Sequence, residues 1–375
     1  MWQPQGFYNQ YVLRSPVILS GKESVLGLYN YPASRIAIIH GKTFFDYELF
    51  ESAFSKKDIR FIERSWKNEP DLEGIKGTVR ELEEFRADTI IAIGGGSVID
   101  GSKLCRLLYE FPYFVPGQTR LTGELFKTQF VAIPTTIGSG AEVSSAAVYI
   151  DHKTHKKDMV VIHELQPEVI VYDKRYVEDT PDRVLVSSAV DGMSHIIEGY
   201  VSRNDNSFVD ILAESGLSLF ATELRKFFGE NREEVNYERL QYAGYMGGVV
   251  QNHCVVGATH AFAHQLSDFG FSHGEAVALL LPQIMVLNSK NEKTFYRYEV
   301  LAKKADFSSV EELELFINML CEKSGISKRK GELVELLKTL SKEVVFRENV
   351  KSDKGGNGNP IEISDNYIDR LVESI

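Results

Sequence analysis

Short apolar runs rich in β-branched residues alternate with amphipathic segments over the first half of the chain. The runs predict strands at residues 35–40, 89–93, 130–134, 146–150 and 169–173. Between the first two strands, residues 72–85 place Ile75, Val79, Leu82 and Phe85 at the spacing of one helix face. Strands that alternate with helices predict βαβ units, and hence a mostly parallel sheet covered on both faces.

The pattern changes after Thr180-Pro181 to long helical segments with few strand-like runs. Helices are predicted at residues 183–202, 208–228, 237–267 and 275–288, and a last helix over 364–374 is capped by Ser364. We therefore predict an N-terminal α/β domain with a mostly parallel, Rossmann-like sheet at residues 1–180, and an all-α domain at residues 181–375. The length of 375 residues fits two domains, at about 150 residues each.

Composition narrows the classes of function. The net charge of −11 argues against nucleic acid as a partner, because phosphate binding needs a basic face. The three cysteines are widely spaced, which excludes a disulfide framework and a cysteine-based zinc site and predicts a cytoplasmic protein. No apolar run reaches the roughly 18 residues of a membrane span, and residues 1–10 lack the basic and apolar regions of a signal peptide.

A glycine-rich turn follows the predicted strand at residues 89–93. Residues 94–97 (Gly-Gly-Gly-Ser) end this strand and begin a helix, where free backbone N–H groups and the helix dipole suit a pyrophosphate. A plain strand-to-helix turn explains the glycines equally well, because the run is not the GxGxxG fingerprint. Residues 134–142 form a second loop rich in glycine and hydroxyl groups, again directly after a strand. The two loops can face one crevice at the carboxyl edge of a parallel sheet, so the pair favours a dinucleotide site.

Residues that bind metals recur at a spacing of four in the helical half. Asp191 and His195 form one pair, His260 and His264 form a second, and His273 follows in a segment flanked by glycine. A spacing of four puts both members of a pair on one helix face. Carboxylate and imidazole donors suit Fe²⁺ or Zn²⁺. A single pair is more often a solvated helix face, but two pairs and a further histidine in apolar helices favour a metal site.

Taken together, these motifs resemble the iron-containing (group III) alcohol dehydrogenase family. The motifs are Gly94-Gly-Gly-Ser-Val-Ile-Asp100, Pro134-Thr-Thr…Gly138-Ser-Gly-Ala-Glu142, Asp191-Gly-Met-Ser-His-Ile-Ile-Glu198 and His260-Ala-Phe-Ala-His264…His273-Gly274. They occur in the family's order over nearly the whole chain. The resemblance implies a dinucleotide-binding domain, a helical metal-binding domain and an active site in the cleft between them. It also implies hydride transfer between NAD or NADP and a small alcohol or aldehyde, in a homo-oligomer that is often a dimer.

The resemblance also implies roles for single residues. The implied ligands of Fe²⁺, or in some members of Zn²⁺, are Asp191, His195, His260 and His273. The residues that it implies at the cofactor are Gly94, Gly95, Gly96, Ser97, Asp100, Thr135, Thr136, Ser139 and Lys157. His264 matches a histidine near the nicotinamide, and we expect it to be the catalytic residue of a proton path.

Two departures from the family pattern bear on specificity. Many NAD-preferring members carry an acidic residue after the first strand, whereas this chain has Gly41 and Lys42. These two residues favour use of NADP(H); the alternative is a plain turn without a role in cofactor choice. His253 stands at a position near the substrate pocket where an asparagine is frequent in the family. We expect the His253 side chain to pack within its own helix. Glu142 is expected to bind backbone amides.

Other functions compete with this interpretation. A lyase that resembles dehydroquinate synthase uses NAD transiently, but it needs lysines and arginines beside the metal, and the surroundings here are mainly apolar. A nucleotide-binding sensor without chemistry is disfavoured because all four ligands are present. The substrate is left open: residues 41–42 and 68–73 resemble members that reduce phosphonoacetaldehyde. Lys153, Lys156 and Lys157 would suit such an anionic aldehyde, although solvated surface lysines are the commoner explanation.

Overall fold

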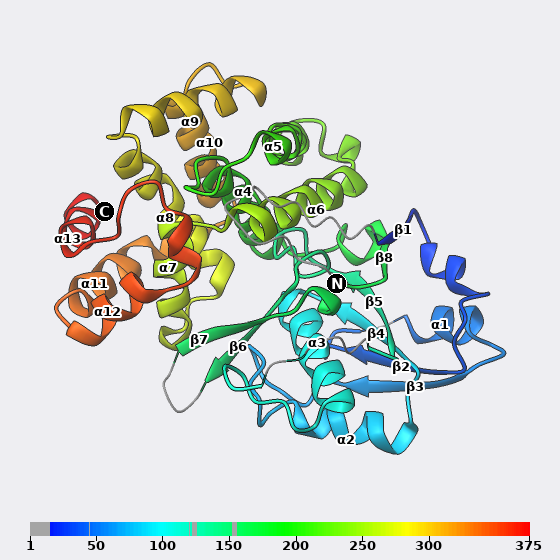
Figure 1. Cartoon of the computed structure of the whole chain (residues 1–375). Helices are drawn as coiled ribbons and strands as arrows, with labels where there is room; N and C mark the ends of the chain where they lie inside the picture. The colour runs from blue at the N-terminus through cyan, green and yellow to red at the C-terminus, as the bar shows by residue number, and fades with distance from the viewer. Residues whose placement is uncertain (1–15, 45, 120, 122–125, 152–155) are drawn as a thin grey trace. The chain divides into compact units, whose positions relative to one another are not determined.

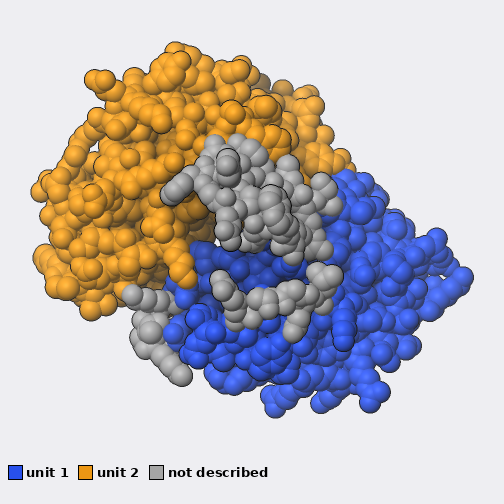
Figure 2. Space-filling model, in the orientation of Figure 1, with its two compact units in different colours: residues 1–136, 141–178 blue, residues 137–140, 179–375 orange. Residues whose placement is uncertain are grey.

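The computed structural model describes residues 16–44, 46–119, 121, 126–151 and 156–375. It divides into two compact units (Figure 2). Unit 1 comprises Met1–Thr136 and Ala141–Glu178, and unit 2 comprises Ile137–Gly140 and Asp179–Ile375. The predictions about residues 1–10 and Lys153 lie outside the described residues. Within the described part of the chain, no helix has the length and apolar character needed to cross a membrane.

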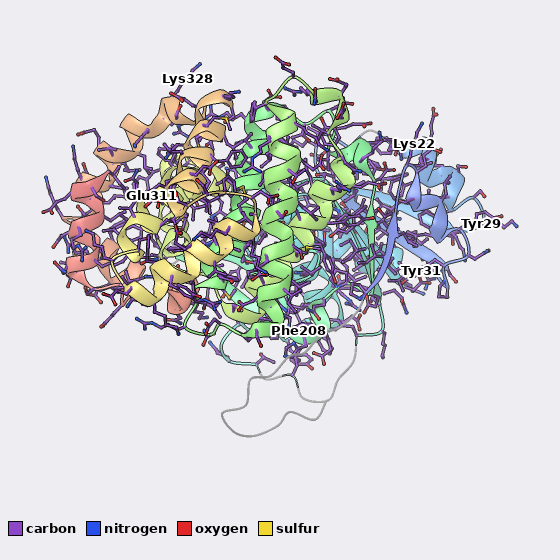
Figure 3. The ribbon with its side chains drawn as sticks, turned by 90° about the horizontal axis from the view of Figure 1, so that it is seen from above. Lys22, Tyr29, Tyr31, Phe208, Glu311 and Lys328 are labelled. Carbon is purple, nitrogen blue, oxygen red and sulfur yellow. The ribbon has the colours of Figure 1, made fainter. Side chains whose placement is uncertain are left out.

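A six-stranded parallel sheet forms the centre of unit 1 (Figure 1). Its strands, in spatial order, are β1 (Val17–Ser20), β8 (Val169–Tyr172), β5 (Gln129–Pro134), β4 (Thr89–Gly94), β2 (Arg35–His40) and β3 (Asp58–Glu63). Each neighbouring pair is parallel. Tyr31, labelled in Figure 3, donates a hydrogen bond to the side chain of Gln129 at the start of β5. The predicted parallel sheet is confirmed.

Helices cover both faces of this sheet because alternate side chains of each strand point to opposite sides. Ile36 and Ile38 of β2 pack in one core with Phe50 of α1 (Tyr47–Ala53). Ala37 and Ile39 pack in the other core, with residues of α2 (Lys76–Phe85) and α3 (Gly96–Glu110). The continuous apolar runs of the central strands follow from this burial on both sides.

The order β3-β2-β4-β5-β8 corresponds to the 2-1-3-4-5 order of flavodoxin-like sheets. In such a sheet the direction of strand addition reverses between the first and third strands, which here are β2 and β4. Ligands of open α/β sheets bind beyond the carboxyl ends of the strands at this reversal. The loops after β2 and β4 therefore flank the position where a cofactor is expected in unit 1.

Four strands differ from the sequence prediction, and the strand at residues 156–161 is one of three that were not predicted. The predicted strand at 146–150 forms β6 (Ala146–Asp151), which pairs antiparallel with β7 (Lys156–Val161) outside the main sheet. β1 was not predicted because it is a short edge strand with mostly exposed side chains. β3 was not predicted because charged residues interrupt its apolar pattern, as expected for the opposite edge.

Unit 2 is helical, and no strand occurs among its described residues. Its helices are α4 (Asp182–Tyr200), α5 (Ser207–Phe227), α6 (Tyr237–Cys254), α7 (Ala258–Ala263), α8 (His273–Asn288), α9 (Glu292–Lys304), α10 (Val310–Lys323), α11 (Lys330–Leu340), α12 (Val344–Ser352) and α13 (Asp365–Ser374). The predicted helical C-terminal region is confirmed. Ser364 caps α13 as predicted, through a bond from the backbone N–H of Tyr367.

The helix predicted over residues 237–267 is instead broken in two. α6 ends at Cys254, where Val255 has a φ of 58°, and α7 begins at Ala258. Positive φ is uncommon for a β-branched residue, so tertiary contacts rather than local preference hold this break. One such contact is tight, because a Cβ built on Gly358 would lie 2.3 Å from the carbonyl oxygen of Val255.

Candidate functional site

Four side chains from three helices of unit 2 converge on one point. Asp191 and His195 lie one turn apart on α4, His260 lies on α7, and His273 is the first residue of α8. The Nε2 atoms of His195, His260 and His273 lie 3.8, 3.6 and 3.5 Å from Oδ1 of Asp191. The structure therefore brings together all four residues that the sequence nominated as metal ligands.

Burial and mutual charge set the protonation states of this group. Burial lowers the pKa of His195 to about 4, so this imidazole is neutral at physiological pH. Burial alone would raise the pKa of Asp191, but the neighbouring histidines hold it well below its usual range. Burial alone would lower the pKa of His260, but the carboxylates of Asp191 and Glu198 raise it to about 9. Metal binding at Nε2 of His260 would therefore release a proton.

Two buried polar atoms test whether a metal ion fits. Within the described part of the chain, Oδ1 of Asp191 and Nε2 of His260 have no hydrogen-bond partner. Leaving such atoms unpaired costs about 1–3 kcal/mol each. Ligand atoms of Asp191, His195 and His260 lie within 4.8 Å of one another. One carboxylate oxygen and imidazole nitrogens are donors that Fe²⁺ and Zn²⁺ accept, so the residues fit one divalent ion.

Glu198 is part of the site, although sequence reasoning gave it no role. Its Oε2 lies 2.7 Å from Nδ1 of His260, and its carboxylate accepts the backbone N–H groups of Gly257 (3.0 Å) and Thr259 (2.7 Å). Burial would raise the pKa of Glu198, but these bonds lower it, so the group is a carboxylate. It holds the proton of His260 on Nδ1 and leaves the Nε2 lone pair for a metal. Its position seven residues after Asp191, on the same helix face, was the available signal.

His264 lies beside the ligand group, as the first residue of a 3₁₀ turn, His264–Phe269. Its ring stacks on that of His273, with centroids 5.2 Å apart and planes at 18°. Its Nδ1 lies 3.0 Å from Oδ2 of Asp353, a residue that follows α12. Sequence reasoning nominated His264 but missed Asp353, because 89 positions separate the two residues.

Two further residues bear on the sequence-based expectations. Nδ1 of His253 lies 2.8 Å from the carbonyl oxygen of Val249, one turn back on α6, as expected for a histidine that packs within its helix. Glu142 is buried and accepts a bond from the Tyr172 hydroxyl at 2.9 Å, as well as one from its own backbone N–H. Burial raises the pKa of Glu142. Its partners are thus a phenol and one backbone amide.

In unit 1, the first glycine loop and the start of the second, residues 134–136, lie side by side at the carboxyl edge of the sheet. The backbone N–H of Thr135 donates to the carbonyl of Gly94 at 3.0 Å. Helix α3 begins at Gly96, with Gly95 as its N-cap residue. A Cβ built on Gly95 would lie 3.2 Å from Cγ2 of Thr136, so the loops pass close to one another. The structure thus brings residues 94–97 together with both threonines.

The hydroxyl of Ser97 already has partners in unit 1. It accepts a bond from the Arg64 guanidinium at 2.8 Å and one from the Trp66 indole at 3.3 Å, and it donates to the carbonyl of Asn68. Arg64 was not singled out from the sequence, because nothing local links it to the glycine loop. It adds a half-buried positive charge beside the first turn of α3.

The remaining residues nominated at the cofactor have structural contacts. Asp100 pairs with the fully buried Lys103 at 3.2 Å, and burial raises the pKa of Asp100 while it lowers that of Lys103. Lys157 pairs with Glu69 at 2.8 Å. Ser139 belongs to unit 2, where its carbonyl accepts a bond from the side chain of Gln251.

Comparisons with known proteins agree over both units. The model of the iron-containing alcohol dehydrogenases matches residues 16–174, and that of the C-terminal region of the same family matches residues 185–374. An alcohol dehydrogenase of Thermococcus barophilus is 30% identical over 313 residues, which cover 81% of each chain. The NADPH-dependent butanol dehydrogenase of Clostridium saccharobutylicum is 28% identical over 84% of this chain and 81% of that protein. The solved iron-containing alcohol dehydrogenase of Thermococcus thioreducens has a TM-score of 0.84 at 26% identity, covering 96% of this chain and 97% of that one.

A parallel-sheet unit followed by a helical unit with this donor set defines a class of metal-containing, nucleotide-dependent oxidoreductases. The chain belongs to the iron-containing alcohol dehydrogenase family. The family uses iron and NAD(P), and the enzyme is an oxidoreductase of the alcohol dehydrogenase type. The resemblance noted from the sequence is confirmed, and the lyase alternative is not favoured.

Proposed function

We propose that Asp191, His195, His260 and His273 hold one Fe²⁺ or Zn²⁺ ion, and that the enzyme transfers hydride between NAD(P)(H) and a small alcohol or aldehyde there. The observation that carries this proposal is the convergence of three histidine Nε2 atoms on one buried, unpartnered carboxylate oxygen. A bound divalent ion supplies Lewis acidity to the oxygen of an alcohol or a carbonyl group.

The chain's own residues supply the rest of the chemistry. Glu198 keeps the Nε2 lone pair of His260 available for a metal by accepting a hydrogen bond from Nδ1–H of His260. Asp191, His195 and His260 are buried, which strengthens the electrostatic interactions among them, whereas the His273 side chain is 23% exposed. A bound NAD(P) would supply the hydride acceptor for alcohol oxidation, and the substrate hydroxyl would have to lose a proton. His264 accepts that proton at Nε2 and passes it to solvent.

The cofactor site of the proposal lies at the carboxyl edge of the sheet in unit 1, at the reversal between β2 and β4. Residues 94–97, Thr135 and Thr136 bind the pyrophosphate through backbone N–H groups and the N-terminus of α3. Among the described residues, a Cβ on Gly41 would meet only Cγ2 of Val98, at 3.8 Å, and Lys42 is exposed. This space and charge suit a 2′-phosphate, so we propose that NADP(H) is used. The name of the Clostridium relative supports the same choice.

The substrate of the proposal is a small alcohol or aldehyde without a required anionic group. The lysines invoked for an anionic aldehyde such as phosphonoacetaldehyde give little support, because Lys157 is 6% exposed and paired with Glu69. Lys153 lies outside the described residues. A homodimer and a cytoplasmic location complete the proposal, and sedimentation of the purified enzyme tests the first of these.

One experiment tests the proposal as a whole. The enzyme is stripped with a chelator and reloaded with Fe²⁺ under anaerobic conditions or with Zn²⁺. NADPH and NADH oxidation is followed at about 340 nm with neutral, carboxylate-bearing and phosphono-bearing aldehydes. We expect metal-dependent turnover of neutral aldehydes with a preference for NADPH. Metal-independent turnover would contradict the proposed centre, and a strong NADH preference would contradict the role of Gly41 and Lys42.

A further inference from the structure

Asp353 is a buried carboxylate whose hydrogen-bond partners among the described residues are all nitrogen atoms. Its Oδ2 lies 3.0 Å from Nδ1 of His264 and 3.3 Å from the side-chain amide nitrogen of Gln265. Its Oδ1 accepts the backbone N–H of Gly355 at 2.8 Å and lies 3.2 Å from the same His264 nitrogen. The Asp353 side chain is 7% exposed and that of His264 is 12% exposed. We infer that Asp353 is the positioning residue of His264, an inference that rests on the proposed role of His264 in moving a proton.

The partners of Asp353 determine which nitrogen of His264 carries the proton. An amide NH₂ and a backbone N–H can only donate, and an ionised carboxylate can only accept. The third contact therefore also uses a donor, which is the Nδ1–H of His264. A neutral imidazole protonated at Nδ1 has its lone pair at Nε2. Asp353 thus keeps Nε2 ready to accept a proton, while the stack on His273 fixes the plane of the ring.

The segment that carries Asp353 is held in place independently of its carboxylate. Asn359 accepts the backbone N–H of Ala258 at 3.1 Å and a side-chain N–H of Asn288 at 2.9 Å. Tyr367 donates to the side-chain oxygen of Asn288 at 3.0 Å. These buried bonds attach the end of the chain to α7 and α8. An isosteric change at Asp353 should therefore leave the backbone in position.

Substitution by asparagine should reverse the tautomer of His264. The backbone N–H of Gly355 has a fixed direction, so the oxygen of an asparagine at position 353 will occupy the place of Oδ1. Its NH₂ group then takes the place of Oδ2, the atom nearer to Nδ1 of His264 (3.0 Å, against 3.2 Å for Oδ1), and turns that nitrogen into an acceptor. The ring proton moves to Nε2, and the nitrogen that should accept the substrate proton is blocked. The same logic explains the loss of activity when the aspartate of a serine protease triad becomes asparagine.

The test compares Asp353→Asn, His264→Ala and the double variant in the metal-loaded enzyme. Asp353→Asn should lower kcat for alcohol oxidation by about 10- to 100-fold. The metal content and the KM for the cofactor should stay unchanged. The effect should vanish in the His264→Ala background, because Asp353 acts through His264. Asp369→Asn, an exposed aspartate that pairs with Arg347, is the matched control and should behave as wild type.

A second readout is the imidazole ¹⁵N spectrum of the zinc-loaded enzyme, with the His264 signal assigned by its absence from His264→Ala. We expect an Nδ1–H tautomer in wild type and an Nε2–H tautomer in Asp353→Asn. The inference is overturned if the tautomer is the same in both, or if Asp353→Asn lowers kcat equally in the His264→Ala background. If His264→Ala alone keeps full kcat, the proposed proton path fails, and the tautomers still decide the role of Asp353.

Discussion

Replacement of Glu198 by glutamine tests how the site prepares its ligands. The carboxylate accepts three donors: Oε2 accepts from His260 Nδ1 and the Gly257 N–H, and Oε1 accepts from the Thr259 N–H. A glutamine has one accepting oxygen, and it keeps most bonds by placing that oxygen at Oε2. Its NH₂ group then faces the Thr259 N–H. The variant therefore loses one buried hydrogen bond and the negative charge behind His260.

These two losses give separate expected magnitudes. A buried donor without a partner costs about 1–3 kcal/mol of folding free energy. A neutral acceptor behind a ligating histidine weakens metal binding by about 10- to 100-fold. That is about 1.4–2.7 kcal/mol of binding free energy. The effect on binding should therefore be visible even where the loss of stability is modest.

The assay is a competition between the protein and a chromophoric chelator for Zn²⁺, together with thermal unfolding of the metal-free protein. Glu223→Gln is the matched control, because Glu223 is fully buried on α5, accepts the backbone N–H of Asn236, and pairs with Lys226 and Arg239. The control should lose stability and keep its metal affinity. Equal metal affinities in wild type, Glu198→Gln and Glu223→Gln would show that the Glu198 carboxylate does not strengthen metal binding by His260.

Further predictions follow from other parts of the fold. His260→Ala should bind no metal and lose most activity, as measured by metal analysis and turnover. Burial and the nearby Glu311 (labelled in Figure 3) raise the pKa of Glu314 from its ordinary value of 4.5 to about 7. The contribution of the Glu314 side chain to the stability of the fold is therefore full below pH 4.5 and is lost as the pH rises through 7. Glu314→Gln should therefore be more stable than wild type by about 1 kcal/mol in urea unfolding near pH 8, and nearly equal near pH 5, after allowance for its partial exposure; a gain of the same size at both pH values would contradict this. Gly244→Ala should destabilise the fold, because its Cβ would lie 2.3 Å from the Ile137 carbonyl oxygen. Gly331→Ala in α11 would meet no described atom within 4 Å and should raise the free energy of unfolding by about 0.5 kcal/mol. Equal effects of the two substitutions in urea unfolding would contradict this expectation.

The sequence predicted the central strands well and the edge strands poorly. β2, β4 and β5 are buried on both faces, so that each appears as a continuous apolar run with distinct ends. β1 and β3 lie at the edges, where exposure removes that pattern. β6 shows the same alternation as a strand of the main sheet. Its partner is instead β7, and no local pattern in the sequence specifies that pairing.

The site was predictable where its residues share a helix. A spacing of four linked Asp191 to His195, and the same spacing drew attention to His260. The fold supplied what local spacing lacks. Val255 ends the first part of the predicted helix, so that α7 begins separately at Ala258, and Asp353 contacts His264 from 89 residues away. The spacing of Glu198 from Asp191 indicates that both lie on one helix face, so its position could have been predicted. Its role could not, because the sequence does not show which residues its carboxylate contacts.

We propose that hydride transfer requires one metal ion, held by Asp191, His195, His260 and His273. The most direct measurement is a titration of the metal-free enzyme with Fe²⁺ under anaerobic conditions, with bound metal and NADPH-dependent aldehyde reduction followed in the same samples. We expect activity to rise in proportion to bound metal and to saturate at about one ion per chain. Full activity before any metal is added, or a His260→Ala variant that binds metal and turns over like wild type, would contradict it.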